Sequence, residues 1–437
     1  MSSSSTSSRS SKSILIIGGG TFGTSTAYHL SQRGYTSVRV LDRWPIPSIE
    51  AAGNDLNKVV RADYAEPLYS RLGSEAMARW KDENGIFKKY FNPTGWLLGA
   101  ANVSLPFIDK SIENSKALGV NLEYMPHDEI RKRWPRVTGK MSGWKVLWNS
   151  AAGWVDARGA LTAMAQAAAR NGVEYISGDA GYVTTLLFDN DKNCIGVQTA
   201  DGKKYMADEI IMAAGASAGS LLDFHGQLVA KGHTVGHLQL TAAEAEYYKG
   251  LPLVDQLEQG MMFPPTSDGI VKFAAVEFFT NKGKHSTIPG ISLPRYRSDH
   301  PQDTIPAAYE SKIRNFIKEL VPELANRPWV ETRICWDADT PDLHFLIAPH
   351  PIHRGLKLAV GGSAHGFKFL PVIGKYIVDM MEGTLEARMG EAWRWRPGVT
   401  SAKAGPEPHP FKSLDLENLE GWNLEGNAGK SGRQSKL

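Results

Sequence analysis

Residues 13–42 read SILIIGGGTFGTSTAYHLSQRGYTSVRVLD, and this stretch decides the fold. Ser13–Ile17 is a short apolar run that predicts a buried strand. A helical pattern follows from Phe22 to Arg33, and Gly34 marks its end. Val38–Leu41 predicts a second buried strand, parallel to the first. The stretch therefore predicts a strand–helix–strand unit, from which α/β folds with a parallel sheet are built.

The glycines between the first strand and the helix have the spacing Gly18-x-Gly20-x-x-Gly23. The first permits a tight turn, the second lets backbone approach a pyrophosphate, and the third lets the helix pack on the sheet. The start of the helix offers free N–H groups and a positive dipole end to phosphates. Asp42, nineteen residues beyond Gly23, can accept hydrogen bonds from a ribose diol. Together these features predict a Rossmann-type dinucleotide site.

This fingerprint does not by itself distinguish NAD from FAD. No second phosphate-binding glycine motif for a nicotinamide cofactor is obvious, which favours an oxidase over a flavin reductase. The apolar strand Glu209–Met212 enters the turn Ala213-Ala214-Gly215-Ala216, which looks like the second cofactor-contacting strand of FAD proteins.

The rest of the chain predicts a fold of the α/β class, in which a Rossmann-type FAD-binding domain is interleaved with a substrate domain that contains a mixed or antiparallel sheet. Further helices are predicted at Leu68–Lys89, Leu161–Asn171, Ala308–Leu320 and Ile373–Met381, strands at Val173–Ile176, Cys194–Thr199 and Leu356–Val360, and alternating strands from Thr234 to Phe279. We expect the FAD-binding domain to comprise residues 13–62, 150–230 and 335–385, and the substrate domain residues 63–149 and 231–334. No internal repeat is evident.

Composition excludes several classes of protein. Hydrophobic residues make up 42% of the 437 residues and the net charge is +3, so no strong basic field points to nucleic acid. The apolar runs have the length of strands and are far too short to span a membrane. Two cysteines, Cys194 and Cys335, argue against a disulfide framework and indicate a reducing compartment.

Both ends of the chain are polar. Residues 1–12 are rich in serine and are expected to form a disordered leader, although a weak transit peptide is an alternative. Residues 398–437 are expected to form a loosely ordered tail. The chain ends in Ser435-Lys436-Leu437, the tripeptide that the peroxisomal import receptor reads, so we expect a peroxisomal enzyme.

Five spaced motifs carry a family resemblance over most of the chain. They are Gly18–Gly23, Ala52-Gly53-Asn54-Asp55-Leu56-Asn57-Lys58, Ile334-Cys335-Trp336, His365-Gly366-Phe367-Lys368 and Trp393-Arg394-Trp395-Arg396-Pro397. With them the chain resembles the fungal fructosyl amino acid oxidases (amadoriases) and, more distantly, monomeric sarcosine oxidase. The resemblance implies FAD as cofactor, a substrate sheet over the flavin and a monomer. It implies cofactor contacts at Gly18, Gly20, Thr21, Phe22, Gly23, Asp42, Arg43, Asn57, Lys58, Ala214, Gly215, Cys335, Gly366, Phe367 and Lys368.

The resemblance also implies a covalent tether. Cys335 matches the cysteine that carries FAD through an 8α-thioether in this family, whereas most free cysteines are small buried core residues. Many amadoriases have a second cysteine two residues further on, where this chain has Asp337. Monomeric sarcosine oxidase lacks it too, so the tether is still expected.

Basic residues are the implied substrate and catalytic groups. Lys368 matches a lysine that binds the substrate carboxylate, Lys58 an active-site lysine, and Arg61 an arginine that pairs with the carboxylate in sarcosine oxidase. Arg61 could instead have a structural role, in an ion pair with Asp63 or Glu66. Lys368 could instead be a surface lysine that extends from a loop into solvent.

Lys272 matches the lysine that activates dioxygen, although it could instead lie on the solvent face of a strand. Glu277 lies near the acid that contacts the sugar of the substrate in amadoriases, but the surrounding family pattern is altered, which puts fructosyl recognition in doubt. No metal-ligand spacing of histidines is evident.

These residues imply an FAD oxidase of the C–N bond of N-substituted amino acids. The carboxylate would bind Lys368 and Arg61, hydride equivalents would pass to FAD, the imine would hydrolyse to amine and carbonyl product, and dioxygen would be reduced to hydrogen peroxide near Lys272. The substrate alternatives are fructosyl amino acids, saccharopine, pipecolate or sarcosine-type acids, and a secondary-metabolite amine. A flavin dehydrogenase that does not use oxygen, or a non-catalytic FAD-binding protein, is the alternative to an oxidase.

Overall fold

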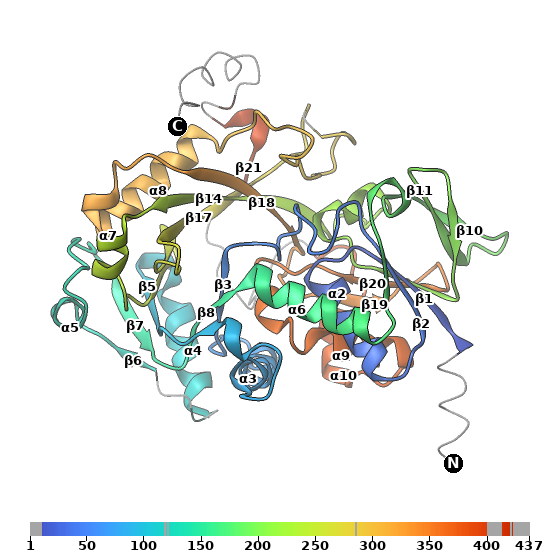
Figure 1. Ribbon diagram of the computed structural model, residues 1–437, viewed down its shortest axis with the longest axis horizontal. Coiled ribbons are helices and arrows are strands. Elements are labelled where there is room, and N and C mark those ends of the chain that lie inside the picture. The colour runs from blue at the N-terminus through green and yellow to red at the C-terminus, as the bar shows by residue number, and fades with distance from the viewer. Residues whose placement is uncertain are drawn as a thin grey trace.

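The computed structural model describes residues 11–117, 119, 122–284, 286–399, 413–419 and 422. Met1–Ser10, which make up most of the expected leader, and Ser435-Lys436-Leu437 lie outside these residues. Most strands belong to two large sheets that lie side by side, and helices pack against both of them (Figure 1).

The first sheet carries the strand–helix–strand unit. Its order is β19 (Leu346–Pro349), β20 (Leu356–Val360), β13 (Glu209–Met212), β1 (Ser13–Ile17), β2 (Ser37–Leu41) and β9 (Glu174–Ile176). All neighbours are parallel except β19 and β20. In the register, Ile17 pairs with Leu41 and with Met212, so Gly18, Asp42 and Ala213 follow at one edge. That edge, where strand order reverses, is where such sheets bind ligands.

The second sheet is mixed and has nine strands. Its order is β18 (Glu331–Asp339), β14 (Val229–Gln239), β17 (Ile270–Thr280), β16 (Gly260–Phe263), β15 (Leu253–Gln256), β5 (Trp96–Ala100), β7 (Lys145–Asn149) and β6 (Glu123–Tyr124), with β21 (Leu414–Asp415) beside β17. The alternating strands predicted between Thr234 and Phe279 are therefore confirmed. The strand β18 belongs to this sheet and crosses the domain boundary expected between residues 334 and 335.

Two small sheets complete the strands. They are β3 (Asn57–Val60), β8 (Gly153–Asp156) and β4 (Phe91–Asn92), and β10 (Val183–Phe188), β11 (Cys194–Thr199) and β12 (Lys204–Met206). The helices are α2 (Thr21–Gln32), α3 (Pro67–Lys81), α4 (Leu105–Ala117), α5 (His127–Arg133), α6 (Ala157–Arg170), α7 (Ala242–Tyr247), α8 (Ala307–Leu320), α9 (Ile373–Glu382) and α10 (Ala387–Trp393).

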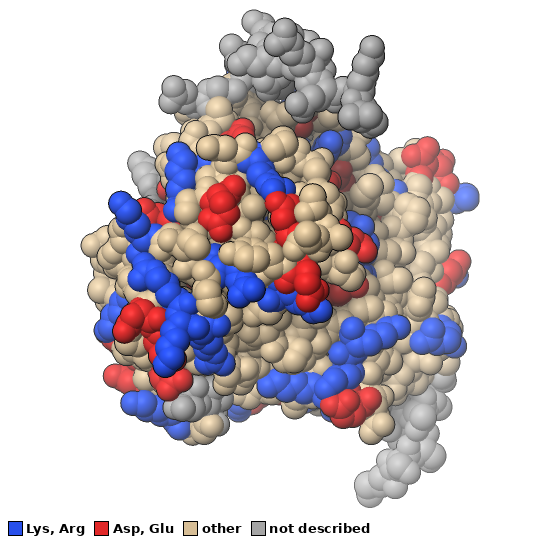
Figure 2. Space-filling view, turned by 60° about the vertical axis from the view of Figure 1, so that its left-hand side comes forward, with Lys and Arg blue, Asp and Glu red and all other residues tan. Residues whose placement is uncertain are grey.

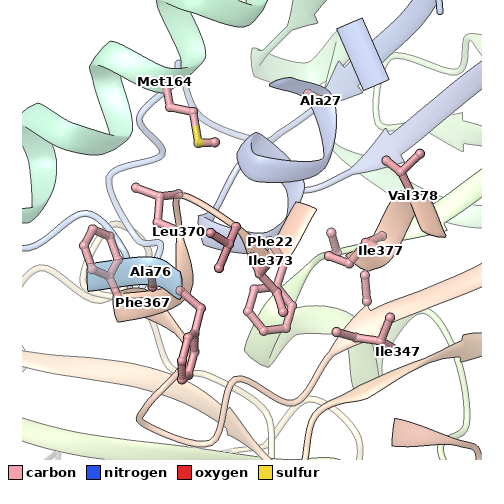
Figure 3. Packing of buried hydrophobic residues seen from close by; sticks show 14 of the residues in the cluster. Phe22, Ala27, Ala76, Met164, Ile347, Phe367, Leu370, Ile373, Ile377 and Val378 are labelled. Carbon is pink, nitrogen blue, oxygen red and sulfur yellow. The ribbon is translucent and has the colours of Figure 1, made fainter. Parts of the chain in front are cut away.

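The main apolar core lies on the helical side of the first sheet. Side chains from α2, α6, α9 and the segment Phe367–Leu370 meet in one cluster, in which Leu370, Ile373 and Ile377 are fully buried (Figure 3). A second core lies between the nine-stranded sheet and α8. The face shown in Figure 2 mixes basic and acidic side chains, and no single sign of charge dominates it.

The predicted end of one helix and the predicted loose order of the whole C-terminal tail are both wrong in part. The helix predicted at Leu68–Lys89 ends at Lys81, because Asp82 closes a turn in which its side chain and carbonyl accept bonds from the N–H groups of Asn84 and Gly85. The tail is ordered at residues 413–419, where β21 pairs with β17 and Leu416 is fully buried. Apolar burial outweighs the polar character of that segment.

Candidate active site

A cavity of about 310 Å³ opens at the edge of the first sheet where β1, β2 and β13 end. Its far wall is formed by Trp336, Asp337 and Ala338 of β18, so it lies between the two large sheets. The predicted residues that line it are Gly18, Gly20, Thr21, Phe22, Asp42, Arg43, Lys58, Ala214, Gly215, Gly366 and Phe367. Gly23, Asn57, Arg61, Lys272, Glu277, Cys335 and Lys368 are outside this lining.

The glycine turn fits a dinucleotide phosphate. Gly18 has a φ of +98°, and a Cβ there would lie 2.6 Å from the carbonyl oxygen of Ala213. A Cβ on Gly23 would overlap the Gly18 carbonyl, so this glycine allows α2 to touch β1. At Gly20 a Cβ would approach nothing closer than Ala51, at 3.7 Å, which leaves room for a ligand. No side chain caps the N-terminus of α2, so its N–H groups can bind an anion.

Asp42 and Arg43 form the wall beyond the glycine turn. Asp42 accepts bonds from the N–H of Gly19 at 2.8 Å and of Trp44 at 2.9 Å. Burial raises the pKa of its carboxyl group. Arg43 donates to Asp299 at 2.8 Å, and its guanidinium lies over the Trp44 ring at 4.7 Å. The carboxylate also accepts a side-chain hydrogen bond from Ser48, and a contact between Asp42 and a ribose hydroxyl stays a prediction.

A buried group of three charges lies beside the cavity. The Asp55 carboxylate lies 3.0 Å from Lys58 Nζ and 2.6 Å from Lys272 Nζ. Lys272 also donates to the carbonyl of Asn57 at 2.8 Å. Lys272 is only 2% exposed, which excludes the alternative that it lies on the solvent face of a strand.

Burial and charge act on these three groups in opposite directions. Burial lowers the pKa of Lys272 to about 8, although Asp55 opposes the fall. Burial also disfavours the Asp55 carboxylate, but the ammonium groups of Lys272 and Lys58 outweigh it and hold the Asp55 pKa far below its usual range. The cluster therefore presents its charges at fixed positions and Lys272 titrates within reach of neutral pH.

Cys335 lies on β18 next to the cavity wall. Its side chain is 3% exposed and its Sγ lies 4.0 Å from the carbonyl oxygen of Ala52. Burial raises the pKa of the thiol, and the nearby Lys58 opposes that rise. Arg333 ties the same strand to the loop that precedes β3, since it donates to the carbonyl of Asn54 at 2.6 Å. The thiol is thus buried on the strand whose next residues, Trp336, Asp337 and Ala338, line the cavity.

A second buried cationic group contains Arg61 and Lys368. The ion pair between Arg61 and Asp63, which was the alternative to substrate binding by Arg61, is present, with the guanidinium 3.7 Å from the carboxylate. Lys368 is 4% exposed, so it is not a surface lysine, and its Nζ donates to the Tyr64 hydroxyl at 2.7 Å. Arg61 lies over the rings of Tyr64 at 4.4 Å and Trp96 at 4.8 Å. Burial raises the pKa of Asp63 to about 6, while Arg61 and Lys368 oppose the rise.

Glu277 is not brought to either group. Its carboxylate pairs with Lys312 of α8, on the outer face of the nine-stranded sheet. The next residue, Phe278, accepts a bond from Tyr309 of the same helix at 3.1 Å. A contact between Glu277 and substrate therefore stays a prediction that this geometry does not support.

Sequence reasoning missed Asp55, Tyr64 and Asp337 as site residues. Asp55 lies in the same motif as Lys58, and Tyr64 follows Arg61 by three residues, so a carboxylate or phenol close to a predicted cation was the available signal. Over the part of the chain that the structure describes, no group of three histidine, cysteine or acidic side chains could hold a metal. No described helix is long and apolar enough to cross a bilayer.

Solved structures share this fold over nearly the whole chain. The fructosamine oxidase amadoriase II of Aspergillus fumigatus, in complex with FSA, superposes with a TM-score of 0.86 at 36% identity, covering 95% of this chain and 97% of that one. Amadoriase I of the same organism gives a TM-score of 0.83 at 32% identity. The predicted fold class is confirmed.

Sequence relatives agree with the structural ones. The L-saccharopine oxidase of Schizosaccharomyces pombe is 32% identical over 410 residues, which cover 88% of this chain and 93% of the relative. A monomeric sarcosine oxidase from Arthrobacter is 24% identical over 374 residues, 84% of this chain and 91% of the relative. Residues 13–380 match the family described as FAD dependent oxidoreductase. The resemblance found in the motifs is confirmed, and the chain belongs to the family of FAD-dependent oxidoreductases.

Proposed function

We propose that this enzyme oxidises the C–N bond of secondary amino acids with dioxygen as electron acceptor. The substrate loses two electrons and two protons as the C–N bond becomes an imine. Water then adds to the imine and releases an amine and a carbonyl product. Dioxygen takes up two electrons and two protons to give hydrogen peroxide. The bound flavin supplies the two-electron chemistry, and the protein supplies binding and electrostatics.

The observation that carries this proposal is the burial of two basic side chains around one ring. Arg61 is 3% exposed and Lys368 is 4% exposed, and both contact Tyr64. Basic side chains held this close together suit a carboxylate, which can accept charge-assisted hydrogen bonds from both. Lys368 and Arg61 would therefore hold the carboxylate and orient the C–N bond.

In the second group, the Asp55 carboxylate lies between the ammonium groups of Lys58 and Lys272. A fixed cation stabilises negative charge as it develops on dioxygen, and no reorganisation is needed at that moment. We assign this role to Lys272, while Asp55 and the carbonyl of Asn57 hold its ammonium in place.

The residues that would hold FAD fit it. The glycine turn and α2 would bind the pyrophosphate, Asp42 the ribose, and the turn at Ala214 and Gly215 with Gly366 and Phe367 would line the rest of the cofactor. Cys335 would tether it through a thioether, and Lys58 next to the thiol would favour the thiolate that this bond needs.

Two substrate classes are supported. The relative of 32% identity is a saccharopine oxidase. The carboxylate of Glu277 pairs with Lys312 and so does not point to a role in binding a sugar. Both observations favour N-alkyl amino acids of the saccharopine, pipecolate or sarcosine type. The structural relatives of 36% identity favour fructosyl amino acids.

The deciding experiment measures peroxide release from purified enzyme with saccharopine, pipecolate, sarcosine and fructosyl amino acids. We expect release with at least one of them, and release from none would remove the oxidase assignment. Turnover with an artificial acceptor but not with oxygen would favour a dehydrogenase. Fluorescent fusions with and without residues 435–437 test import into peroxisomes, and gel filtration tests the proposed monomer.

A further inference from the structure

Tyr64 connects the two cations of the proposed carboxylate site. Its side chain is fully buried, its hydroxyl accepts a hydrogen bond from Lys368 Nζ at 2.7 Å, and its ring lies 4.4 Å from the guanidinium of Arg61. A phenol oxygen bonded to a buried ammonium limits the rotamers that the lysine can adopt. The other end of Lys368 is fixed as well, since its carbonyl accepts a bond from Trp80 Nε1 at 2.8 Å.

The direction of these hydrogen bonds follows from His365 and Lys368. Nε2 of His365 lies 3.0 Å from the carbonyl oxygen of Leu343, which can only accept, so Nε2 carries the proton. The Lys368 ammonium can only donate, so the Tyr64 hydroxyl accepts from it and directs its own proton toward Nδ1 of His365, 3.3 Å away. The hydroxyl therefore donates to His365 and presents a lone pair to Lys368, which suits the protonated lysine.

The imidazole itself is held in place by aromatic packing. The ring of His365 stacks on Phe345 with centroids 4.9 Å apart and meets the edge of Tyr69 at 4.9 Å. Since the ring cannot turn freely, the position of Nδ1 is set, and with it the orientation of the phenol.

We propose that Tyr64 is a positioning residue for Lys368. Its hydroxyl, oriented by His365, holds the Lys368 ammonium at the place where the substrate carboxylate binds beside Arg61. This inference rests on the proposed function, because it concerns the same carboxylate site. Without the hydroxyl, the lysine keeps its charge but loses its preorganised orientation.

Binding of a carboxylate to the holoenzyme tests this inference without turnover. The probe is (methylthio)acetate, in which sulfur replaces the amine nitrogen, and its amide is the control because it lacks the carboxylate. Dissociation constants come from the change in flavin absorbance on titration. We expect Tyr64→Phe to weaken binding of the acid about tenfold or more, as for loss of a hydrogen bond to a charged group, and to leave the amide unchanged.

A double-mutant cycle separates positioning from a structural role. Lys368→Met removes the ammonium, so adding Tyr64→Phe in that background should weaken the acid no further. The matched control is Tyr69→Phe, which removes a neighbouring buried hydroxyl that bonds to Trp393 and to the N–H of Phe345 rather than to Lys368. Tyr69→Phe should bind the acid as the wild type does. Equal weakening by Tyr64→Phe in both backgrounds, or by Tyr69→Phe, would overturn the proposal.

A second pair of variants applies where Tyr64→Phe does not accumulate as folded holoenzyme. His365→Asn keeps an acceptor near the position of Nδ1 and His365→Leu does not, so only the leucine variant should weaken the acid. Equal affinities in the two variants would overturn the inference. The proposed function and this inference can fail separately. If no secondary amino acid gave peroxide, but Tyr64→Phe weakened the acid only when Lys368 was present, the proposed function would be rejected and the role of Tyr64 would stand.

Discussion

At the scale of single residues, the site depends on charges that are buried in small groups. Asp55 holds two lysines, and Asp63 partly neutralises Arg61. Leaving one member of such a group unpaired costs far more than the pair gains in water. Substitutions of these residues therefore report on electrostatics.

Lys272→Met tests the proposed reaction with oxygen. Substrate should still reduce the flavin, while reoxidation by oxygen should slow by about 10²–10³-fold, as on loss of a preorganised electrostatic group. In the wild type, reoxidation should slow as pH rises through about 8, since Lys272 loses its charge there, and in the variant it should be flat. Stopped-flow absorbance measures both half-reactions. Lys357→Met, which removes a lysine paired with Glu209, is the control and should reoxidise normally.

At the scale of elements, the turn between β1 and α2 contains glycines with different physical roles. A Cβ at Gly23 would overlap the carbonyl of Gly18, which follows β1, whereas one at Gly20 would only reach van der Waals contact with Ala51, at 3.7 Å. The first substitution therefore perturbs packing, and the second perturbs only what binds there.

Gly20→Ala and Gly23→Ala should separate these roles. Gly23→Ala should lower the yield of folded protein and the free energy of unfolding, because its methyl group overlaps the Gly18 carbonyl. Gly20→Ala should fold but carry less flavin. Urea denaturation and the ratio of absorbance at the flavin band to that at 280 nm measure the two effects. Full flavin content in soluble Gly20→Ala would show that the cofactor phosphates bind elsewhere.

The packing of β21 and the residues that follow it on the nine-stranded sheet can be tested in the same way. Leu416→Ala should lower the free energy of unfolding by about 2–5 kcal/mol, because a fully buried leucine is lost. Leu414→Ala, two residues earlier and 49% exposed, should change it by about 0.5 kcal/mol or less. Equal and small effects in urea denaturation would show that this segment does not pack on β17 in solution.

At the scale of the whole molecule, the cavity lies between the two large sheets, and its walls come from both. A ligand that contacts both sheets binds only the folded arrangement. Its binding free energy therefore adds to the stability of the entire chain.

Cys335→Ser makes this linkage measurable. The variant should release its flavin on acid precipitation, while the wild type stays yellow. Its melting temperature should rise with added FAD, by an amount that corresponds to about 2.7 kcal/mol at a concentration 100 times the dissociation constant. The wild type should show no dependence on added FAD. Acid release of the flavin from wild-type enzyme would disprove the tether.

Local patterns in the sequence were enough to predict several elements of this protein. The strands Ser13–Ile17, Cys194–Thr199, Glu209–Met212 and Leu356–Val360 were predicted with their observed bounds, because short apolar runs bounded by turn residues favour strands. The glycine spacing predicted the dinucleotide turn. The family resemblance also named Lys58, Lys272, Lys368 and Arg61.

The pairing of those cations follows from the folding of distant segments and could not be predicted from the sequence. Asp55 meets Lys272 across 217 positions of sequence, and Tyr64 meets Lys368 across 304. Glu277, adjacent to matched motifs, instead pairs with α8. The periodicity of apolar residues predicts which face of a strand or helix a side chain occupies. A buried charge, however, pairs with the partner that the packed sheets and helices bring within a few ångströms. Burial makes pairing energetically important, because an unpaired buried charge is costly. The partner cannot be predicted from local sequence, because it comes from a distant segment.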